Sequence, residues 1–334
     1  MHVLGRPDDT AAPVLPLGQF RAPDGSHGAR VAVDANGPHA ALVVGKRGSG
    51  KTYTLGVLAE ALARTDGVTA VVIDPMRAFA TLPDAVPATV TRPRIPAAAL
   101  PPQAWCDVLN LPPHTPAGAL LWQAAAETDT LDAMADRLGE HETPAGRAAR
   151  NALALADSWD VFTSTDETRF LDSDHVTVLD CAALPRPALA AVTRAVTDTV
   201  YETAIAGGVD ALPWVLLDEA HAVTGTAAWP GLRRLLTRGR KPGISTVLAT
   251  QRPGALPPSA VSQADLLVAH RLTARDDLDA LETASPTYLT GALADSLPRA
   301  PGDALVVDDT SETAHDLTVR ERDAIHGGRS RTVV

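Results

Sequence analysis

Cysteine is almost absent from this sequence. Cys106 and Cys181 are the only two in 334 residues, and neither has a partner at the spacing of a metal site. Two cysteines in so long a chain do not make a disulfide framework. We therefore predict two reduced thiols that lie in the protein core.

Long apolar runs are also missing. No stretch approaches the roughly 18 apolar residues that a membrane-spanning helix needs. The N-terminus lacks a charged segment followed by an apolar one, which is the pattern of a secretory signal. We expect no membrane partner and a cytoplasmic location, or a virion-associated one if the protein is viral.

Lysine and net positive charge are scarce as well. Only three of the 29 basic residues are lysines (Lys46, Lys51 and Lys241), and the formal net charge is −11. The lysine shortage has two explanations: codon bias in a GC-rich genome, or adaptation to high salt, where a carboxylate-rich surface stays hydrated. No global basic field draws in nucleic acid, which argues against passive DNA coating. A ring with a locally basic pore is still compatible with this charge.

What is present is the pattern of an α/β protein. An apolar run at 40–44 is followed by a glycine-rich segment, a helical pattern at 53–64 and a second apolar run at 68–73. This order predicts a βαβ unit with a right-handed crossover. The other short apolar runs, which we expect to extend one mostly parallel sheet, are 175–180, 214–217, 245–249, 266–269 and, as an edge strand, 303–307.

Proline and glycine indicate how the chain is divided. Residues 1–37 are rich in both and predict an irregular lead-in with edge strands. The main domain is expected at 38–310. Within it, 81–172 begins with dense proline, which disfavours regular structure, and continues with a helical pattern, so we interpret it as an inserted subdomain. Residues 311–334 are expected to form a C-terminal strand and tail.

The strongest motif follows the first apolar run. It reads Gly45-Lys46-Arg47-Gly48-Ser49-Gly50-Lys51-Thr52. Triphosphate binding needs several backbone N–H groups that converge at a helix N-terminus, and glycines permit the tight turns this requires. Lys51 is predicted to reach the β- and γ-phosphates and Thr52 to coordinate Mg²⁺. With Tyr53, which follows directly, these residues form the predicted site for ATP and Mg²⁺.

Two further strands end in polar residues. Asp218 and Glu219 follow an apolar strand, where we expect both carboxylates to point at the phosphate loop. Asp218 is predicted to bind Mg²⁺, mainly through water, and Glu219 to act as general base for the attacking water. Gln251 ends the next strand and is predicted to sense the γ-phosphate. The competing interpretation is a pair of solvated acids and an ordinary turn at Arg252-Pro253.

A basic run lies between the Asp-Glu strand and the Gln strand. On an isolated monomer such a run is usually a solvated helix face. The functional interpretation is an arginine finger that reaches across a subunit boundary and stabilises charge on the transferring phosphoryl group. The run consists of Arg233, Arg234, Arg238, Arg240 and Lys241.

The segment Asp218-Glu219-Ala220-His221 superficially matches the box of two-domain helicases. Those enzymes carry a second RecA-like lobe after the box, and only 113 residues follow His221. We expect this to be too short for a second lobe. His221 is therefore predicted to be a helix-start residue near the site.

The order of these motifs resembles the HerA/FtsK superfamily of hexameric DNA-translocating ATPases. The resemblance covers about residues 38–80 and 173–310, with Asp74 where HerA-like proteins end their second strand in Asp-Pro. It implies a RecA-like (ASCE) P-loop NTPase fold, with Arg240 as the trans finger and Gln251 as the sensor. The matching segments are Arg238-Gly239-Arg240-Lys241-Pro242-Gly243-Ile244, Leu248-Ala249-Thr250-Gln251-Arg252-Pro253, Leu256-Pro257, Ser262-Gln263-Ala264-Asp265 and His270-Arg271-Leu272-Thr273.

The sequence also departs from that family. The 37 N-terminal residues are too few for the β-barrel of HerA-type helicases, and Met76-Arg77-Ala78-Phe79 replaces the usual His-Gly-Glu-Tyr. The membrane segments and DNA-reading domain of FtsK-type proteins have no counterpart. What remains resembles the genome-packaging ATPases of viruses and the small HerA-like proteins of archaea and mobile elements.

The sequence therefore predicts a Mg²⁺-dependent ATPase that works as a homohexamer and translocates double-stranded DNA. A nuclease, or a viral capsid or portal component, is the expected further partner. The alternative is a nucleotide switch or protein-remodelling ATPase that does not touch DNA.

Overall fold

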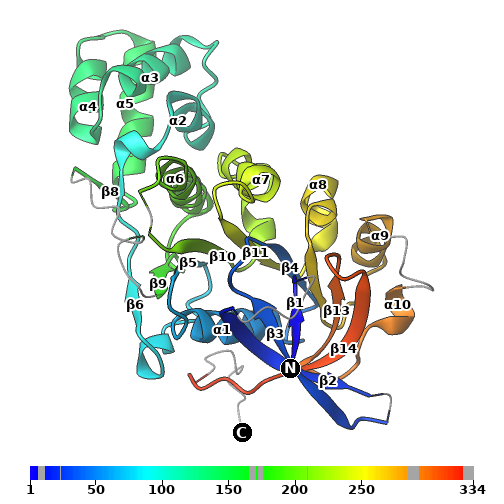
Figure 1. Ribbon diagram of the computed structural model, residues 1–334. Helices are drawn as coiled ribbons and strands as arrows, with labels where there is room; N and C mark the ends of the chain where they lie inside the picture. Colours follow the sequence, from blue (N-terminus) through cyan, green and yellow to red (C-terminus); the bar gives the residue numbers. More distant parts are fainter. Residues whose placement is uncertain are drawn as a thin grey trace, which may run out of the picture.

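The computed structural model describes residues 1–6, 12–22, 24–164, 171, 176–208, 210–284 and 293–325. Twelve strands form one sheet in the order β1-β3-β2-β14-β13-β12-β4-β11-β10-β5-β9-β6. Helix α1 covers one face, and α6, α7 and α8 cover the other (Figure 1). Alternate residues of each central strand enter the two cores: Leu42 and Val44 pack on one side, Ala41 and Val43 on the other.

One half of the sheet is parallel throughout, as its unbroken apolar runs predict. Its strands are β4 (Ala40–Val44), β5 (Val68–Asp74), β6 (Ala88–Thr91), β9 (Val176–Asp180), β10 (Leu212–Leu217), β11 (Ser245–Thr250) and β12 (Leu266–Ala269). Strand β11 lies between β4 and β10. The predicted RecA-like fold, with a mostly parallel central sheet, is confirmed.

The other half contains mainly antiparallel pairs. It consists of β1 (His2–Leu4), β2 (Val14–Arg21), β3 (His27–Asp34), β13 (Asp303–Asp308) and β14 (Thr313–Val319). The prediction of an edge strand at 303–307 is wrong, because β13 pairs with β12 on one side and β14 on the other. The two chain ends thus meet in one sheet, where β14 pairs with β2.

The helices outside the insertion connect these strands. They are α1 (Lys51–Leu62), α6 (Arg186–Ile205), α7 (Trp229–Arg238), α8 (Pro258–Ser262), α9 (Arg275–Ala284) and α10 (Leu293–Ser296), with short 3-10 turns η1 (Leu82–Asp84), η2 (Ala97–Ala99), η4 (Ala220–Val223) and η5 (Pro253–Ala255). Within the described ranges, no helix has both the length and the apolar character needed to cross a membrane.

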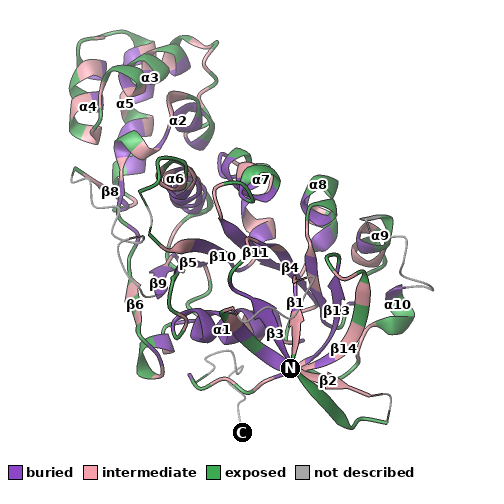
Figure 2. Cartoon of the chain, viewed as in Figure 1, coloured by how far each residue is buried: buried purple, intermediate pink, exposed green. Residues whose placement is uncertain are grey.

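Four helices project from the sheet beside α6 (Figure 1). They are α2 (Pro102–Val108), α3 (Pro116–Glu127), α4 (Leu131–Gly139) and α5 (Pro144–Asp157), and a two-stranded pair of β7 (Ile95–Pro96) and β8 (Phe162–Thr163) lies at their base. Thr115 and Thr143 each cap a helix whose first residue is proline by accepting the N–H of the glycine three residues on. Figure 2 shows the central strands of the sheet buried and the outer turns of these helices exposed.

Candidate nucleotide-binding site

The predicted site residues gather at one edge of the sheet. Strands β4, β10 and β11 run parallel, and Val44, the last residue of β4, lies opposite Thr250, the last residue of β11. The carboxyl ends of parallel strands meet at the same edge, which is where ligands bind in open α/β sheets. The phosphate loop, the Asp218-Glu219 pair and Gln251 follow these three strands.

Glycine is required in the phosphate loop for two different reasons. Gly48 has φ 76° and no atom near the position of a Cβ, so its conformation alone favours glycine. At Gly45 a Cβ would lie 2.4 Å from Ser49 Oγ and 2.7 Å from His270 Cβ, and at Gly50 it would lie 2.9 Å from His270 Cε1. The loop is therefore folded tightly on itself and against His270.

The loop is anchored at both of its ends by backbone hydrogen bonds. Lys46 donates its N–H to the carbonyl of Arg271 at 2.8 Å, and Gly302 donates to the carbonyl of Ser49 at 3.1 Å. Within the loop, Ser49 Oγ donates to the carbonyl of Lys46 at 2.8 Å. Arg47 and Gly48 at the tip are exposed. The wall behind the loop is thus built from the chain after β12 and before β13.

His270 is the centre of that wall. It is fully buried, its Nδ1 lies 2.8 Å from the carbonyl oxygen of Asp303, and its Nε2 lies 2.8 Å from Thr54 Oγ1. A carbonyl only accepts, so the network assigns the proton to Nδ1 and leaves Nε2 to accept from Thr54. Burial lowers the pKa of this imidazole to about 4. A neutral histidine therefore joins the phosphate loop, helix α1 and β13.

Lys51 opens helix α1 and is 4% exposed. Its ammonium lies 3.3 Å from the carbonyl oxygen of Lys46. Burial lowers the pKa of the ammonium, while the charges of Glu219 and Asp218 raise it. A cation held in the loop between backbone and two carboxylates is suited to bind phosphate.

Thr52 and Asp218 are in direct contact. Thr52 Oγ1 donates to Asp218 Oδ2 at 2.7 Å, and the N–H of Glu219 donates to Asp218 Oδ1 at 2.9 Å. Asp218 is fully buried, and this burial raises its pKa to about 6. The structure thus brings together the two oxygen donors that the sequence predicts as Mg²⁺ ligands.

These donors fit Mg²⁺ but do not by themselves make a metal cage. In the part of the chain that the structure describes, no group of three or more His, Cys, Asp or Glu side chains could hold a metal. Mg²⁺ usually takes one or two protein oxygens and completes its shell with water and phosphate. Thr52 and Asp218 would supply that minimal set beside a bound triphosphate.

Glu219 lies at the turn that follows β10. Its backbone is left-handed, with φ 51° and ψ 44°, and it precedes η4. Such a conformation is uncommon for a residue with a side chain, and strained residues of this kind cluster at functional sites. Burial raises the pKa of the Glu219 carboxyl, whereas Lys51 and a hydrogen bond with Gln251 lower it. The predicted base and the predicted sensor are therefore neighbours.

The basic run does not reach this site within one chain. Arg240 is exposed and precedes β11, whereas Gln251 follows β11, so the two residues lie at opposite edges of the sheet. Arg234 is committed to α6, where it pairs with Asp198 at 2.5 Å and with Glu202 at 2.9 Å. The remaining members, Arg233, Arg238 and Lys241, are exposed.

Asp74 has a structural position at the end of β5. It is buried, and its carboxylate accepts the N–H groups of Met76 at 3.0 Å and Phe79 at 2.9 Å. Those bonds fold the segment in which the sequence departs from the HerA pattern. Arg77, at φ 57°, pairs there with Asp180 at 3.3 Å.

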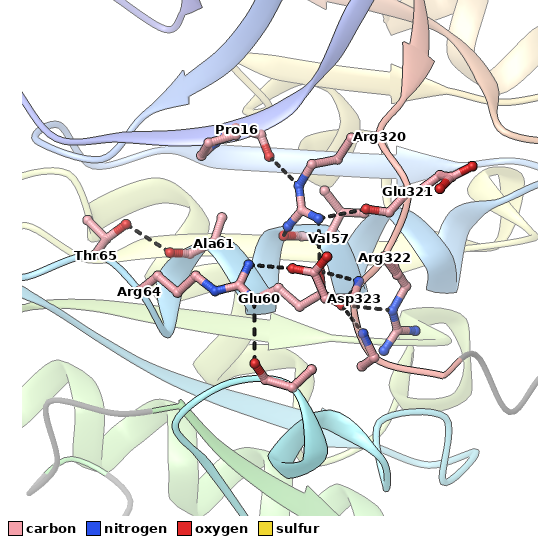
Figure 3. Close-up of polar contacts among 12 residues, drawn as sticks. Pro16, Val57, Glu60, Ala61, Arg64, Thr65, Arg320, Glu321, Arg322 and Asp323 are labelled. Atoms are coloured by element: carbon pink, nitrogen blue, oxygen red, sulfur yellow. Dashed lines mark hydrogen bonds and ion pairs between the residues drawn. The ribbon is translucent and has the colours of Figure 1, made fainter.

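Helix α1 is held from behind by the segment 320–325, which follows β14. Figure 3 shows Arg320 and Arg322 directed at Glu60 of α1. Arg320 donates to Glu60 Oε2 at 2.9 Å, and the N–H groups of Asp323 and Ala324 donate to the same carboxylate. The N–H of Arg322 also donates to the hydroxyl of Tyr53 at 2.7 Å. The end of the described chain thus fixes the helix that begins at the phosphate loop.

Comparison with known proteins agrees with this architecture. Residues 17–143 match the model of a family described as the central domain of helicase HerA. VirB4 of Thermoanaerobacter pseudethanolicus has the same fold, with a TM-score of 0.72 at 18% identity over 95% of this chain and 98% of that one. The family match over residues 17–143 and the shared fold support the resemblance to HerA/FtsK-type P-loop ATPases.

A second solved structure also shares the fold. The bacterial conjugative coupling protein TrwBdeltaN70 has a TM-score of 0.60 at 15% identity, over 96% of this chain and 91% of that one. The genome packaging NTPase B204 of Sulfolobus turreted icosahedral virus 2 also matches, at 13% identity over 84% of this chain and 96% of that chain. Its TM-score of 0.44 is too low for comparison of the folds in detail. No protein of curated function matches the sequence significantly.

Two histidines at this site make contacts that the sequence does not predict. In the sequence, His270 stands out only as part of the segment His270-Arg271-Leu272-Thr273 that resembles the HerA/FtsK pattern. The signal that could have identified it is its position directly after a buried strand that neighbours the strand before the phosphate loop. The sequence predicts His221 as a helix-start residue, and His221 lies in η4. Its ring, however, lies against Glu219 and Thr250.

Proposed function

We propose that the protein is a Mg²⁺-dependent ATPase that works as a homohexamer and translocates double-stranded DNA. The observation that carries the proposal is the gathering of Lys51, the Thr52–Asp218 pair and the Glu219–Gln251 pair at one edge of a RecA-like sheet. These are the parts needed to hold a triphosphate, place a metal and activate water.

Each residue has a distinct task in this proposal. The N–H groups of the phosphate loop and Lys51 bind the β- and γ-phosphates, with Lys46, Arg47 and Tyr53 beside them. Thr52 and Asp218 would hold Mg²⁺, whose charge would offset that of the phosphates. Glu219 takes the proton of the attacking water, and Gln251 orients that water against the γ-phosphate.

A homohexamer explains why Arg240 lies far from its own site. It projects into solvent at the opposite edge, and no ion pair holds it among the residues that the structure describes. In a head-to-tail ring, one surface of each subunit meets a different surface of the next. Arg240 of one protomer would then complete the site of its neighbour as an arginine finger.

DNA as the cargo is inferred from the HerA family match of residues 17–143 and from the fold shared with TrwB. TrwB is a bacterial conjugative coupling protein. The same motor unit, residues 38–310, suits packaging with a capsid or portal component, or processing beside a nuclease. Either role places the protein in the cytoplasm, or in a virion if it is viral.

Two measurements test the proposal. ATP hydrolysis is expected to rise when duplex DNA is added. Lys51→Ala is expected to abolish both nucleotide binding and hydrolysis. Glu219→Gln is expected to abolish hydrolysis while nucleotide binding persists. Electron microscopy with a non-hydrolysable ATP analogue and duplex DNA is expected to show a six-membered ring around the DNA.

The net charge of −11 favours one alternative, a nucleotide switch or protein-remodelling ATPase without DNA. ATPase activity that duplex DNA leaves unchanged at every salt concentration would support that alternative and overturn the DNA proposal.

A further inference from the structure

His221 lies between the proposed general base and the strand that ends in the proposed sensor. Its Nδ1 is 3.2 Å from Glu219 Oε2 and also 3.2 Å from Thr250 Oγ1. Thr250 is the last residue of β11 and immediately precedes Gln251. One ring nitrogen is thus within reach of two groups that belong to different strands of the site.

His221 is not needed as a helix cap. Turn η4 begins after Glu219, and no side chain caps it. The ring nitrogen that has polar neighbours faces the catalytic edge of the sheet, and only about a fifth of the His221 side chain is exposed. Starting the turn would not require the ring to contact both Glu219 and Thr250.

The hydrogen-bonding capacity of Thr250 decides how the three groups can be arranged. Its Oγ1 accepts the N–H of Arg252 at 3.0 Å, which leaves the hydroxyl proton free to be donated. When His221 Nδ1 carries no proton, it accepts from Thr250. When Nδ1 carries the proton, it can donate to the Glu219 carboxylate instead.

The surroundings of Glu219 favour the second arrangement, in which His221 Nδ1 donates to its carboxylate. Within the described chain, its Oε2 is buried and makes no hydrogen bond, although His221 Nδ1 lies 3.2 Å away. A buried carboxylate oxygen without a donor is costly, and a small movement of the ring would satisfy it. Gln251 already holds the same carboxyl group from another side.

We propose that His221 is a positioning residue for ATP hydrolysis. Its Nδ1 exchanges between accepting from Thr250 and donating to Glu219. The orientation of the Glu219 carboxylate is thereby coupled to the position of Thr250 at the end of β11. Movement of Thr250 and Gln251 on nucleotide binding would in this way set Glu219 against the attacking water. This inference rests on the proposed ATPase function.

The groups that face His221 support the exchange. Burial lowers the pKa of the imidazole, the nearby positive charges of Arg252 and Lys51 lower it further, and Asp218 and Asp277 raise it. The neutral ring has one proton to place on Nδ1 or Nε2, which is the condition for switching between the two partners.

The test compares variants that keep or remove the Nδ1 position. His221→Phe fills the site without a nitrogen, and His221→Asn places a polar atom near Nδ1. We expect His221→Phe to lower kcat about 100-fold, as misplaced catalytic groups do, with KM for ATP and affinity for a fluorescent ATP analogue within about twofold of wild type. His221→Asn should recover most of kcat. His114→Phe, an exposed position in the insertion, is the control and should leave both constants unchanged.

A double-mutant cycle tests the link to β11. Thr250→Val should lower kcat like His221→Phe, and the double variant should be no worse than either single variant, because all three break one chain of contacts. A normal kcat in folded His221→Phe, a loss confined to KM, or fully additive losses would overturn the inference. Thermal unfolding checks that each variant is folded, and His221→Asn provides the comparison if His221→Phe is not.

Failure of the inference differs from failure of the proposed function. If wild type hydrolyses ATP in a Glu219-dependent manner and His221→Phe is equally active, only the role of His221 is lost. If wild type binds the ATP analogue through Lys51 and does not hydrolyse ATP, the proposed function and this inference both fall.

Discussion

The guanidinium of Arg322 lies 3.5 Å from a carboxylate oxygen of Glu60, and the two side chains are 1% and 0% exposed. Glu60 belongs to the helix that begins at the phosphate loop, and Arg322 belongs to the end of the described chain (Figure 3). A buried carboxylate depends on all of its donors, since removal of one partner leaves an uncompensated charge. The relationship makes the last described segment part of the scaffold of the site.

Replacement of Glu60 by glutamine should therefore unfold the chain more easily. We expect a loss of about 3 kcal/mol in the free energy of unfolding, because Arg322 would keep a buried charge without a carboxylate, and Arg320 would lose its partner as well. Urea denaturation measures the loss, and limited proteolysis should show earlier cleavage near 320–325. Asp323→Asn is the matched control: its ion pair with Arg64 is half-exposed, so the change should be under about 1 kcal/mol. Equal stability of Glu60→Gln and wild type would contradict the buried pair.

Gly56 gives a second, independent test of the same packing. A Cβ at this position would lie 2.4 Å from the central carbon of the Arg322 guanidinium. Alanine favours helix over glycine by about 1 kcal/mol, but overpacking against a held side chain costs about 1–3 kcal/mol. We expect Gly56→Ala to be destabilising. Gly139→Ala, at a helical glycine with open space around it, should be neutral or stabilising in the same assay. A stabilised Gly56→Ala would show that Arg322 does not occupy this position.

Such contacts could not be predicted from the sequence. The loop glycines, Lys51, Thr52, Asp218 and Glu219 stand in local patterns, and parallel strands then bring them to one edge. Glu60 and Arg322 are 262 residues apart, and in a helical pattern Glu60 looks like an ordinary surface acid. Pairing between distant strands likewise places β11 between β4 and β10 and puts β13 in the interior of the sheet. Apolar runs in the sequence do not encode this pairing.

The pKa of His270 predicts how stability responds to acid. Burial holds this pKa at about 4 in the folded chain, against 6.5 as the ordinary value. Between these values the unfolded chain binds the proton first, so His270 lowers stability as the pH falls from 6.5 to 4, by roughly 3 kcal/mol in total. Asp218 acts in the opposite direction. Burial raises its pKa from 3.8 to about 6, so the folded chain binds that proton first and gains stability as the pH falls through 6.

Because the two effects offset each other, the informative quantity is the difference in the free energy of unfolding between wild type and a variant that lacks His270. His270→Gln should be less stable than wild type at pH 7.5, since it loses the fitted contacts to Thr54 and Asp303. This difference in the free energy of unfolding should narrow as the pH falls from 6.5 to 4, because only wild type contains the histidine whose protonation in the unfolded chain lowers stability. Urea denaturation at several pH values measures it, and a gap that stays constant over this range would rule out a buried neutral His270.

Arg240 permits a test that separates a finger in trans from one in cis. Arg240→Ala should keep affinity for ATP and lower hydrolysis by about 10³-fold, whereas Arg238→Ala, also exposed and close in sequence, should change it little. Lys51→Ala is inactive for a different reason, since it cannot bind nucleotide but still carries Arg240. In rings mixed from the two inactive proteins, some interfaces join an intact phosphate loop to a neighbour's intact Arg240. A finger in trans therefore predicts that mixing restores part of the activity, with a maximum near equal amounts. If Arg240 acts within its own subunit, no interface is complete, and the mixture stays as inactive as its components.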